Sequence, residues 1–103
     1  MIDLATVTVE QFANAVGDRF GVVVDGEERL ALELVEAIPA VKELPADSSL
    51  ARTPFSLVFA GPAEPLLAQQ IVPLQHPTLG LLEIFLVPVE RGAAGARYEA
   101  VFS

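Results

Sequence analysis

The sequence lacks cysteine, and its basic residues are few. Its 103 residues include six lysines and arginines against fourteen aspartates and glutamates, which gives a net charge of −8. Without cysteine, disulfides and thiolate chemistry are excluded, and packing alone must hold the fold. The negative field repels phosphate backbones and anionic lipid headgroups, which argues against nucleic-acid and membrane-surface partners. The same charge keeps an apolar chain in solution.

Long apolar runs are missing as well. Glu83 and Glu90 interrupt the most apolar region, well short of the ~20 residues that a membrane-spanning helix needs. The first residues, Met1-Ile2-Asp3-Leu4, show no basic region, apolar stretch or cleavage site of a signal peptide. We therefore expect a cytoplasmic protein, although export by a non-classical route would leave no mark here.

Apolar residues, by contrast, make up 52% of the chain. This share excludes disorder as the default state. The length is typical of one domain, so we expect residues 1–103 to form a single domain. A domain of this size cannot bury all of its apolar residues. The surplus predicts an apolar surface that contacts a protein partner or another copy of the chain.

One helix is expected, from Val9 to Val16. Thr8 can cap its start, and Gln11 stands at the position that completes a capping box. Gly17 can end it. Apolar residues recur at the helical spacing of one docking face. They are Val9, Phe12, Ala13 and Val16.

Most of the remaining sequence has the alternation of β-strands. Asp25-Gly26 is a hairpin turn signal. Residues 29–37 also have helix propensity, but the valine-rich segment and the turn before them favour a strand. Residues 39–53 are expected to form a loop. The expected strands are Gly21–Val24, Arg29–Val35, Phe55–Phe59, Ile71–Leu74, Leu82–Val89 and Arg97–Phe102. This count predicts a mainly β fold: a small antiparallel barrel or sandwich with one short N-terminal helix.

Two of these strands carry further predictions. Pro73 lacks an N–H group, which favours an edge position for Ile71–Leu74. Leu82–Val89 is apolar on both faces, which predicts a central strand covered on each side. The helix is expected as one cover, and the rest of a closed barrel or a partner as the other. An exposed edge can bind a partner by strand addition. The candidate partner contacts are Ile71, Val72, Leu74 and His76.

Residues suited to catalysis or metal binding are isolated. His76 is the only histidine, and beside Pro77 it is expected to pack or hydrogen-bond locally. A metal site would need carboxylates beside it, because no cysteine is available. The acidic residues Asp25, Glu27 and Glu28 lack the spacing of a calcium loop. We therefore predict no catalytic residue, no cofactor and no metal site.

Serine and glycine patterns do not change this prediction. Ser48, Ser49 and Ser56 are not flanked by the glycines of a nucleophile elbow. Residues 91–95 lack the ending of a phosphate-binding loop. Arg97 is expected to pair with Glu83 or Glu90 across the last hairpin, which serves strand register.

Several segments resemble one family of small, functionally uncharacterised bacterial proteins. They are PFSLVF at 54–59 with Gly61-Pro62, His76-Pro77 with Leu79-Gly80, FLVPV at 85–89 and RYEAVF at 97–102. The resemblance spans nearly the whole chain and is more specific in its second half. Ala60 departs from it, since a bulkier polar residue is expected there. Members often accompany proteins with phage-tail-collar-like domains, so the resemblance implies a role near tail-like or fibrous assemblies and no catalytic residues.

The leading hypothesis is a non-enzymatic protein-binding or assembly module, such as an accessory, adaptor or chaperone. Two alternatives remain open. One is a small-ligand-binding barrel or an unrecognised hydrolase, with His76 and an acidic neighbour at the mouth of a pocket. The other is a structural subunit of a larger complex.

Overall fold

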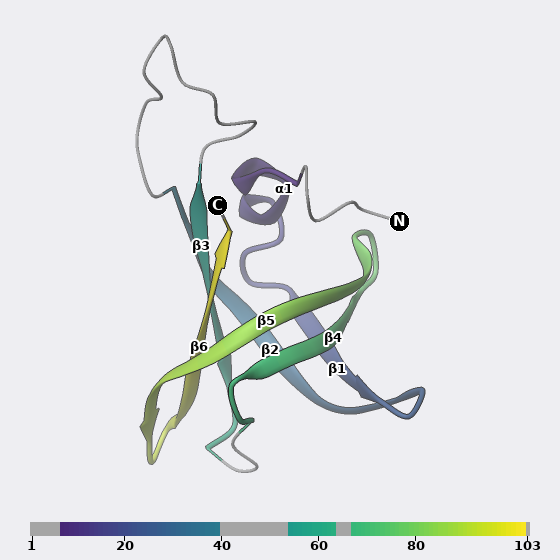
Figure 1. Ribbon diagram of the computed structural model, residues 1–103, viewed down its shortest axis with the longest axis vertical. Coiled ribbons are helices and arrows are strands. Elements are labelled where there is room, and N and C mark those ends of the chain that lie inside the picture. The colour runs from purple at the N-terminus through teal and green to yellow at the C-terminus, as the bar shows by residue number, and fades with distance from the viewer. Residues whose placement is uncertain (1–6, 40–53, 64–66, 103) are drawn as a thin grey trace, which may run out of the picture.

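The computed structural model describes residues 7–39, 54–63 and 67–102. This part of the chain contains a short helix and six strands (Figure 1). The elements are α1 (Val9–Ala13), β1 (Arg19–Val24), β2 (Glu27–Pro39), β3 (Phe55–Gly61), β4 (Gln70–His76), β5 (Gly80–Gly92) and β6 (Gly95–Phe102). The mainly β class is confirmed, and residues 29–37 are strand. The expected loop at 39–53 lies outside the described residues, apart from Pro39, which ends β2.

The six strands form a closed antiparallel barrel in the order β1-β2-β3-β6-β5-β4, which decides between barrel and sandwich. Two three-stranded meanders, β1–β3 and β4–β6, build it. The β3–β6 ladder joins them along its whole length, from Phe55–Phe102 to Gly61–Ala96. The β1–β4 ladder joins them only at Gly21–Gln75 and Val22–Leu74. The barrel therefore has one strong and one weak seam.

The edge position predicted from Pro73 is wrong for β4 as a whole, because closure gives this strand neighbours on both sides. Pro73 is paired with Glu83 of β5. On the β1 side the ladder stops at Leu74, one residue before the proline. The missing N–H of Pro73 thus falls where that ladder has already ended, a place where proline is tolerated.

Alternate side chains of every strand fill the barrel, as the period of two requires. Inward residues of β5 such as Leu86 are buried, but Phe85 on its outer face is half exposed. The rest of the closed barrel covers the inner face of β5, as predicted, but the helix does not cover the outer face. The outer face of β5 has no layer over it among the described elements. The buried apolar strand residues are Phe20, Val22, Leu32, Leu34, Phe55, Leu57, Phe59, Val72, Leu74, Leu82, Ile84, Leu86, Ala96, Tyr98 and Ala100.

Helix α1 closes the end of the barrel where β3 begins and β6 ends (Figure 1). Its Phe12 is fully buried, with ring centroids 5.9 Å from Phe55 and 5.7 Å from Phe102. The expected capping box contributes a bond from the N–H group of Thr8 to Oε1 of Gln11, at 2.9 Å. The helix covers this opening and contacts β2 and β3, rather than lying on β5 as predicted.

The helix is also shorter than the predicted Val9–Val16. It ends at Ala13, and of the expected apolar stripe Phe12 is buried whereas Ala13 and Val16 are exposed. Residues 14–17 form a turn that leads into β1. Gly17 then donates its N–H group to the carbonyl of Leu34, at 2.7 Å. The chain therefore leaves the helix early because it bonds to the barrel wall.

Two hairpin turns need backbone conformations that most residues avoid. Asp25 and Gly26 have φ angles of 53° and 80°, the two positive values of a type I′ turn, as their dipeptide predicts. Gly95, which pairs with Gly92 at the β5–β6 turn, has a φ of 145°. A Cβ atom built on Gly95 would lie 2.6 Å from the carbonyl oxygen of Gly61. Glycine is required there for both reasons.

Replacing Gly95 with alanine is expected to lower the free energy of unfolding by about 2–4 kcal/mol. The positive φ alone costs about 1–3 kcal/mol, and the contact with Gly61 adds to it. Gly92→Ala is the matched control, because it lies at the same turn with no atom within 4 Å of its Cβ position and no positive φ. Urea unfolding of both variants measures the difference. Equal stability losses would contradict this account.

Candidate functional site

The four candidate partner contacts on β4 do not share one face. Ile71 is 61% exposed on the outside of the barrel. Val72, Leu74 and His76 point inward and are at most 3% exposed. The prediction is therefore corrected: alternation along the strand leaves Ile71 alone of the four on the outer surface.

The imidazole of His76 is bonded through both of its nitrogens. Nδ1 accepts hydrogen bonds from the N–H groups of Thr78, at 3.2 Å, and Leu79, at 3.1 Å. The Thr78 hydroxyl lies 3.2 Å from the same nitrogen. Since Nδ1 accepts from backbone donors, the ring proton is on Nε2, which donates to Oδ2 of Asp18 at 2.8 Å.

The surroundings of His76 are those of a structural residue. Its ring packs on Phe20, with centroids 4.7 Å apart. Asp18, by contrast, has a side chain that is 51% exposed. The pair thus ties the β4–β5 turn to the segment between α1 and β1. The local hydrogen bonding predicted for His76 is confirmed, and Asp18 is the acidic neighbour that the sequence did not identify.

The described residues contain no group of three or more histidine, aspartate or glutamate side chains placed to hold a metal ion. At the β1–β2 hairpin, Glu28 pairs with Arg19, and Glu27 lies 3.3 Å from the guanidinium of Arg29. The predicted pairing of Arg97 is found with Glu90, at 3.5 Å. These are exposed ion pairs, which normally contribute little to stability. In the same described ranges, no helix has the length and apolar character to cross a membrane.

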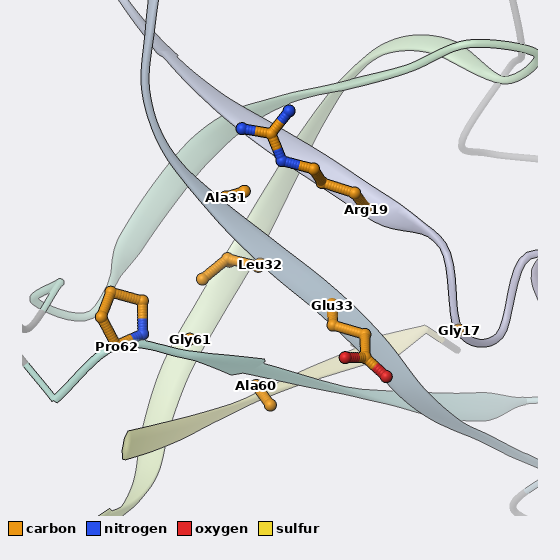
Figure 2. A pocket seen from close by; sticks show the side chains of 8 residues that line it. All are labelled: Gly17, Arg19, Ala31, Leu32, Glu33, Ala60, Gly61 and Pro62. Atoms are coloured by element: carbon orange, nitrogen blue, oxygen red, sulfur yellow. The ribbon is translucent and has the colours of Figure 1, made fainter. Parts of the chain in front are cut away.

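A shallow hollow of about 400 Å³ lies over β1, β2 and the end of β3 (Figure 2). Small residues form its floor, and Arg19 and Glu33 extend from it in opposite directions (Figure 2). The guanidinium of Arg19 is already paired with Glu28. The hollow holds neither a nucleophile with a base nor His76. Its lining consists of Gly17, Arg19, Ala31, Leu32, Glu33, Ala60, Gly61 and Pro62.

Ile71 and Phe85 form an apolar area on the outer face around β4, and together with Val24 at the weak seam we name them the β4 patch. Ile71 and Phe85 face each other across the β4–β5 ladder, a position in which side chains touch. Val24 and Ile71 line the same small hollow at the weak seam. The three side chains are 46%, 61% and 49% exposed. Sequence analysis missed Val24 and Phe85, although the two apolar faces of β5 were a signal for the latter.

Comparison with known families matches residues 7–102 to a domain of unknown function, DUF6916. No curated protein and no solved structure matches the chain.

Proposed function

Since this chain belongs to the DUF6916 family of domains of unknown function, we propose a function from its own surface: a non-enzymatic protein-binding module that uses the β4 patch. The observation that carries the proposal is the direct opposition of Ile71 and Phe85 on an outer face that no described element covers. Single exposed apolar residues are ordinary, whereas adjoining ones indicate a contact surface.

The energetic argument follows from area. Covering apolar surface stabilises a complex by about 25 cal/mol for each Å² removed from water. Large aromatic and branched side chains supply most of that area, and Phe85 and Ile71 are such residues. Their position in strands also limits the entropy lost on binding, because the backbone beneath them is already ordered.

The non-enzymatic part of the proposal is supported by His76. A general base needs a nitrogen within reach of a substrate proton. Here both ring nitrogens are engaged inside the barrel, and the ring is buried against Phe20. This arrangement favours a binding module over a hydrolase that uses His76.

The resemblance noted in the sequence suggests the class of partner. Proteins with tail-collar-like domains are the first to test, with this domain as their accessory, adaptor or chaperone. A permanent structural subunit of the same assembly would differ in one respect. It would co-purify at fixed stoichiometry through every step, whereas an adaptor or chaperone would dissociate.

Lysine at position 71 or 85 is expected to abolish partner capture, because a charge in a buried contact is strongly unfavourable. Tagged wild-type protein, Ile71→Lys and Phe85→Lys would be compared in native lysate of the source organism by quantitative mass spectrometry. Ile38→Lys is the matched control, since Ile38 is 44% exposed on β2, across the barrel from β5. The expected result is a set of proteins retained by wild type and Ile38→Lys only. If all four baits captured the same proteins, the proposal would be wrong.

A further inference from the structure

The weak seam leaves part of β4 without a neighbouring strand. The ladder with β1 ends at Val22–Leu74, but β4 extends from there back to Gln70. Within the described chain, no β1 residue is paired with Gln70–Pro73. On the other side of the gap, β1 turns away into its hairpin with β2, as Figure 1 shows. A short stretch of strand edge is therefore available in a closed barrel.

A hollow of about 80 Å³ lies in this gap. Pockets for small molecules and cofactors usually measure about 300–1,000 Å³, so this one is too small for such a ligand. Its size suits one aliphatic side chain. Its walls are apolar apart from Gln70, and it adjoins the β4 patch. The lining residues are Val22, Val24, Leu67, Gln70, Ile71, Val72 and Pro73.

The charges beside the gap indicate which kind of protein segment could bind there. Glu83 lies opposite Pro73 and two residues from Phe85 on the same outer face. Glu99 is opposite Val87, farther along β5. Neither carboxylate forms an ion pair with another described residue. A second copy of this chain would place its own carboxylates beside these two and would add a net charge of −8. The two copies would therefore repel each other. A basic partner neutralises the carboxylates.

We propose that the weak seam binds an extended segment of another protein as an added strand on Gln70–Pro73. One aliphatic side chain of that segment enters the seam hollow, and a flanking lysine or arginine pairs with Glu83. Main-chain hydrogen bonds supply affinity in this mode, while pockets for alternate side chains supply specificity. Pro73 ends the added ladder because it has no N–H group to donate. This inference rests on the proposed function and names its partner.

The test uses two blocked synthetic peptides and the ¹⁵N-labelled full chain. In one peptide lysine alternates with valine, and in the other glutamate replaces lysine. The lysine peptide is expected to shift the amide signals of Gln70–Val72 and Val24 in a saturable way. The glutamate peptide is expected to bind at least about tenfold more weakly, since like charges at a contact are repelled. Ile71→Lys should abolish the shifts, and Ile38→Lys should keep them.

A charge reversal isolates the role of Glu83. Glu83→Lys is expected to lower the affinity for the lysine peptide about two- to fivefold, the effect of one exposed ion pair. Glu36→Lys changes the net charge equally but lies on β2, so it should have less effect. Equal binding of both peptides, shifts centred elsewhere, or no shifts at all would overturn the inference.

Self-association is a separate outcome. If light scattering shows a dimer that Ile71→Lys converts to a monomer, the occupant is a second copy and the inference is wrong. The proposed function would still stand in that case if capture from lysate depends on Ile71 and Phe85. Capture from lysate therefore tests the proposed function, and peptide binding tests this inference, and one can fail without the other.

Discussion

Replacing Phe12 with alanine is expected to lower the free energy of unfolding by about 3–5 kcal/mol, the usual cost of removing a buried aromatic ring. Phe12 is fully buried and joins a three-ring cluster in which Phe55 and Phe102 stack with centroids 4.7 Å apart. A five-residue helix has little stability of its own. Phe12 is the one buried side chain within the helix, so the docking depends mainly on this ring, and the truncation opens the end of the barrel to water.

Differential scanning calorimetry and urea unfolding measure this effect. A loss of this size corresponds to a fall in Tm of at least about 12 °C, at about 4–8 °C for each kcal/mol in a domain of this length. Glu10→Ala is the control, because Glu10 lies on the same helix with its side chain exposed. It should change the stability by less than about 0.5 kcal/mol. A Phe12→Ala loss as small as that would mean that α1 does not hold the barrel end.

Substitution of His76 by phenylalanine is expected to cost about 2–5 kcal/mol. Phenylalanine keeps the ring against Phe20 but leaves the N–H groups of Thr78 and Leu79 without their acceptor. Both bonds are part-buried, and a donor left without a partner away from water costs about 1–3 kcal/mol. The substitution also removes the donor to Asp18. The loss should appear in urea unfolding, with faster amide exchange in the turn at residues 77–79.

Asp18→Ala tests the bond at Nε2 of His76 separately from the two backbone bonds at Nδ1. Half of the Asp18 side chain is in contact with solvent, so water can replace its carboxylate, and we expect a loss of only about 1 kcal/mol. Thus His76 matters mainly as the acceptor that organises the β4–β5 turn. If Asp18→Ala and His76→Phe lowered the free energy of unfolding equally, the bond between Asp18 and His76 would be the stabilising one, and the bonds to the turn N–H groups would not.

The local pattern of the sequence was enough to predict six strands and their hairpins. Asp25-Gly26 specified its turn because few dipeptides accept two positive φ angles. The strand ends were predicted too short, as at Glu27 and Gln70. Such residues have low strand propensity, and pairing with a neighbouring strand overrides it. Gly92 and Gly95 lie outside the predicted strands, yet they are paired with each other.

Features that depend on distant segments were not predictable in this way. Asp18 and His76 are 58 positions apart, so nothing local connects them. Periodicity showed that Phe85 and Leu86 are both apolar, but it could not tell which faces solvent or that no layer covers it. Pro73 indicated a missing ladder bond correctly. A single proline cannot show whether β4 is the edge of an open sheet or part of a closed barrel. In this barrel the β1–β4 ladder ends at Leu74, one residue short of Pro73.

The unequal seams also determine how the barrel fluctuates. Sub-global openings follow the smallest set of backbone bonds, so the two meanders should separate first along Gly21–Gln75 and Val22–Leu74. The β3–β6 ladder then acts as the hinge. The barrel is therefore expected to open into a sheet at this seam before it opens at any other ladder. A strand that binds Gln70–Pro73 needs no such opening, because β1 leaves that edge unpaired in the closed barrel.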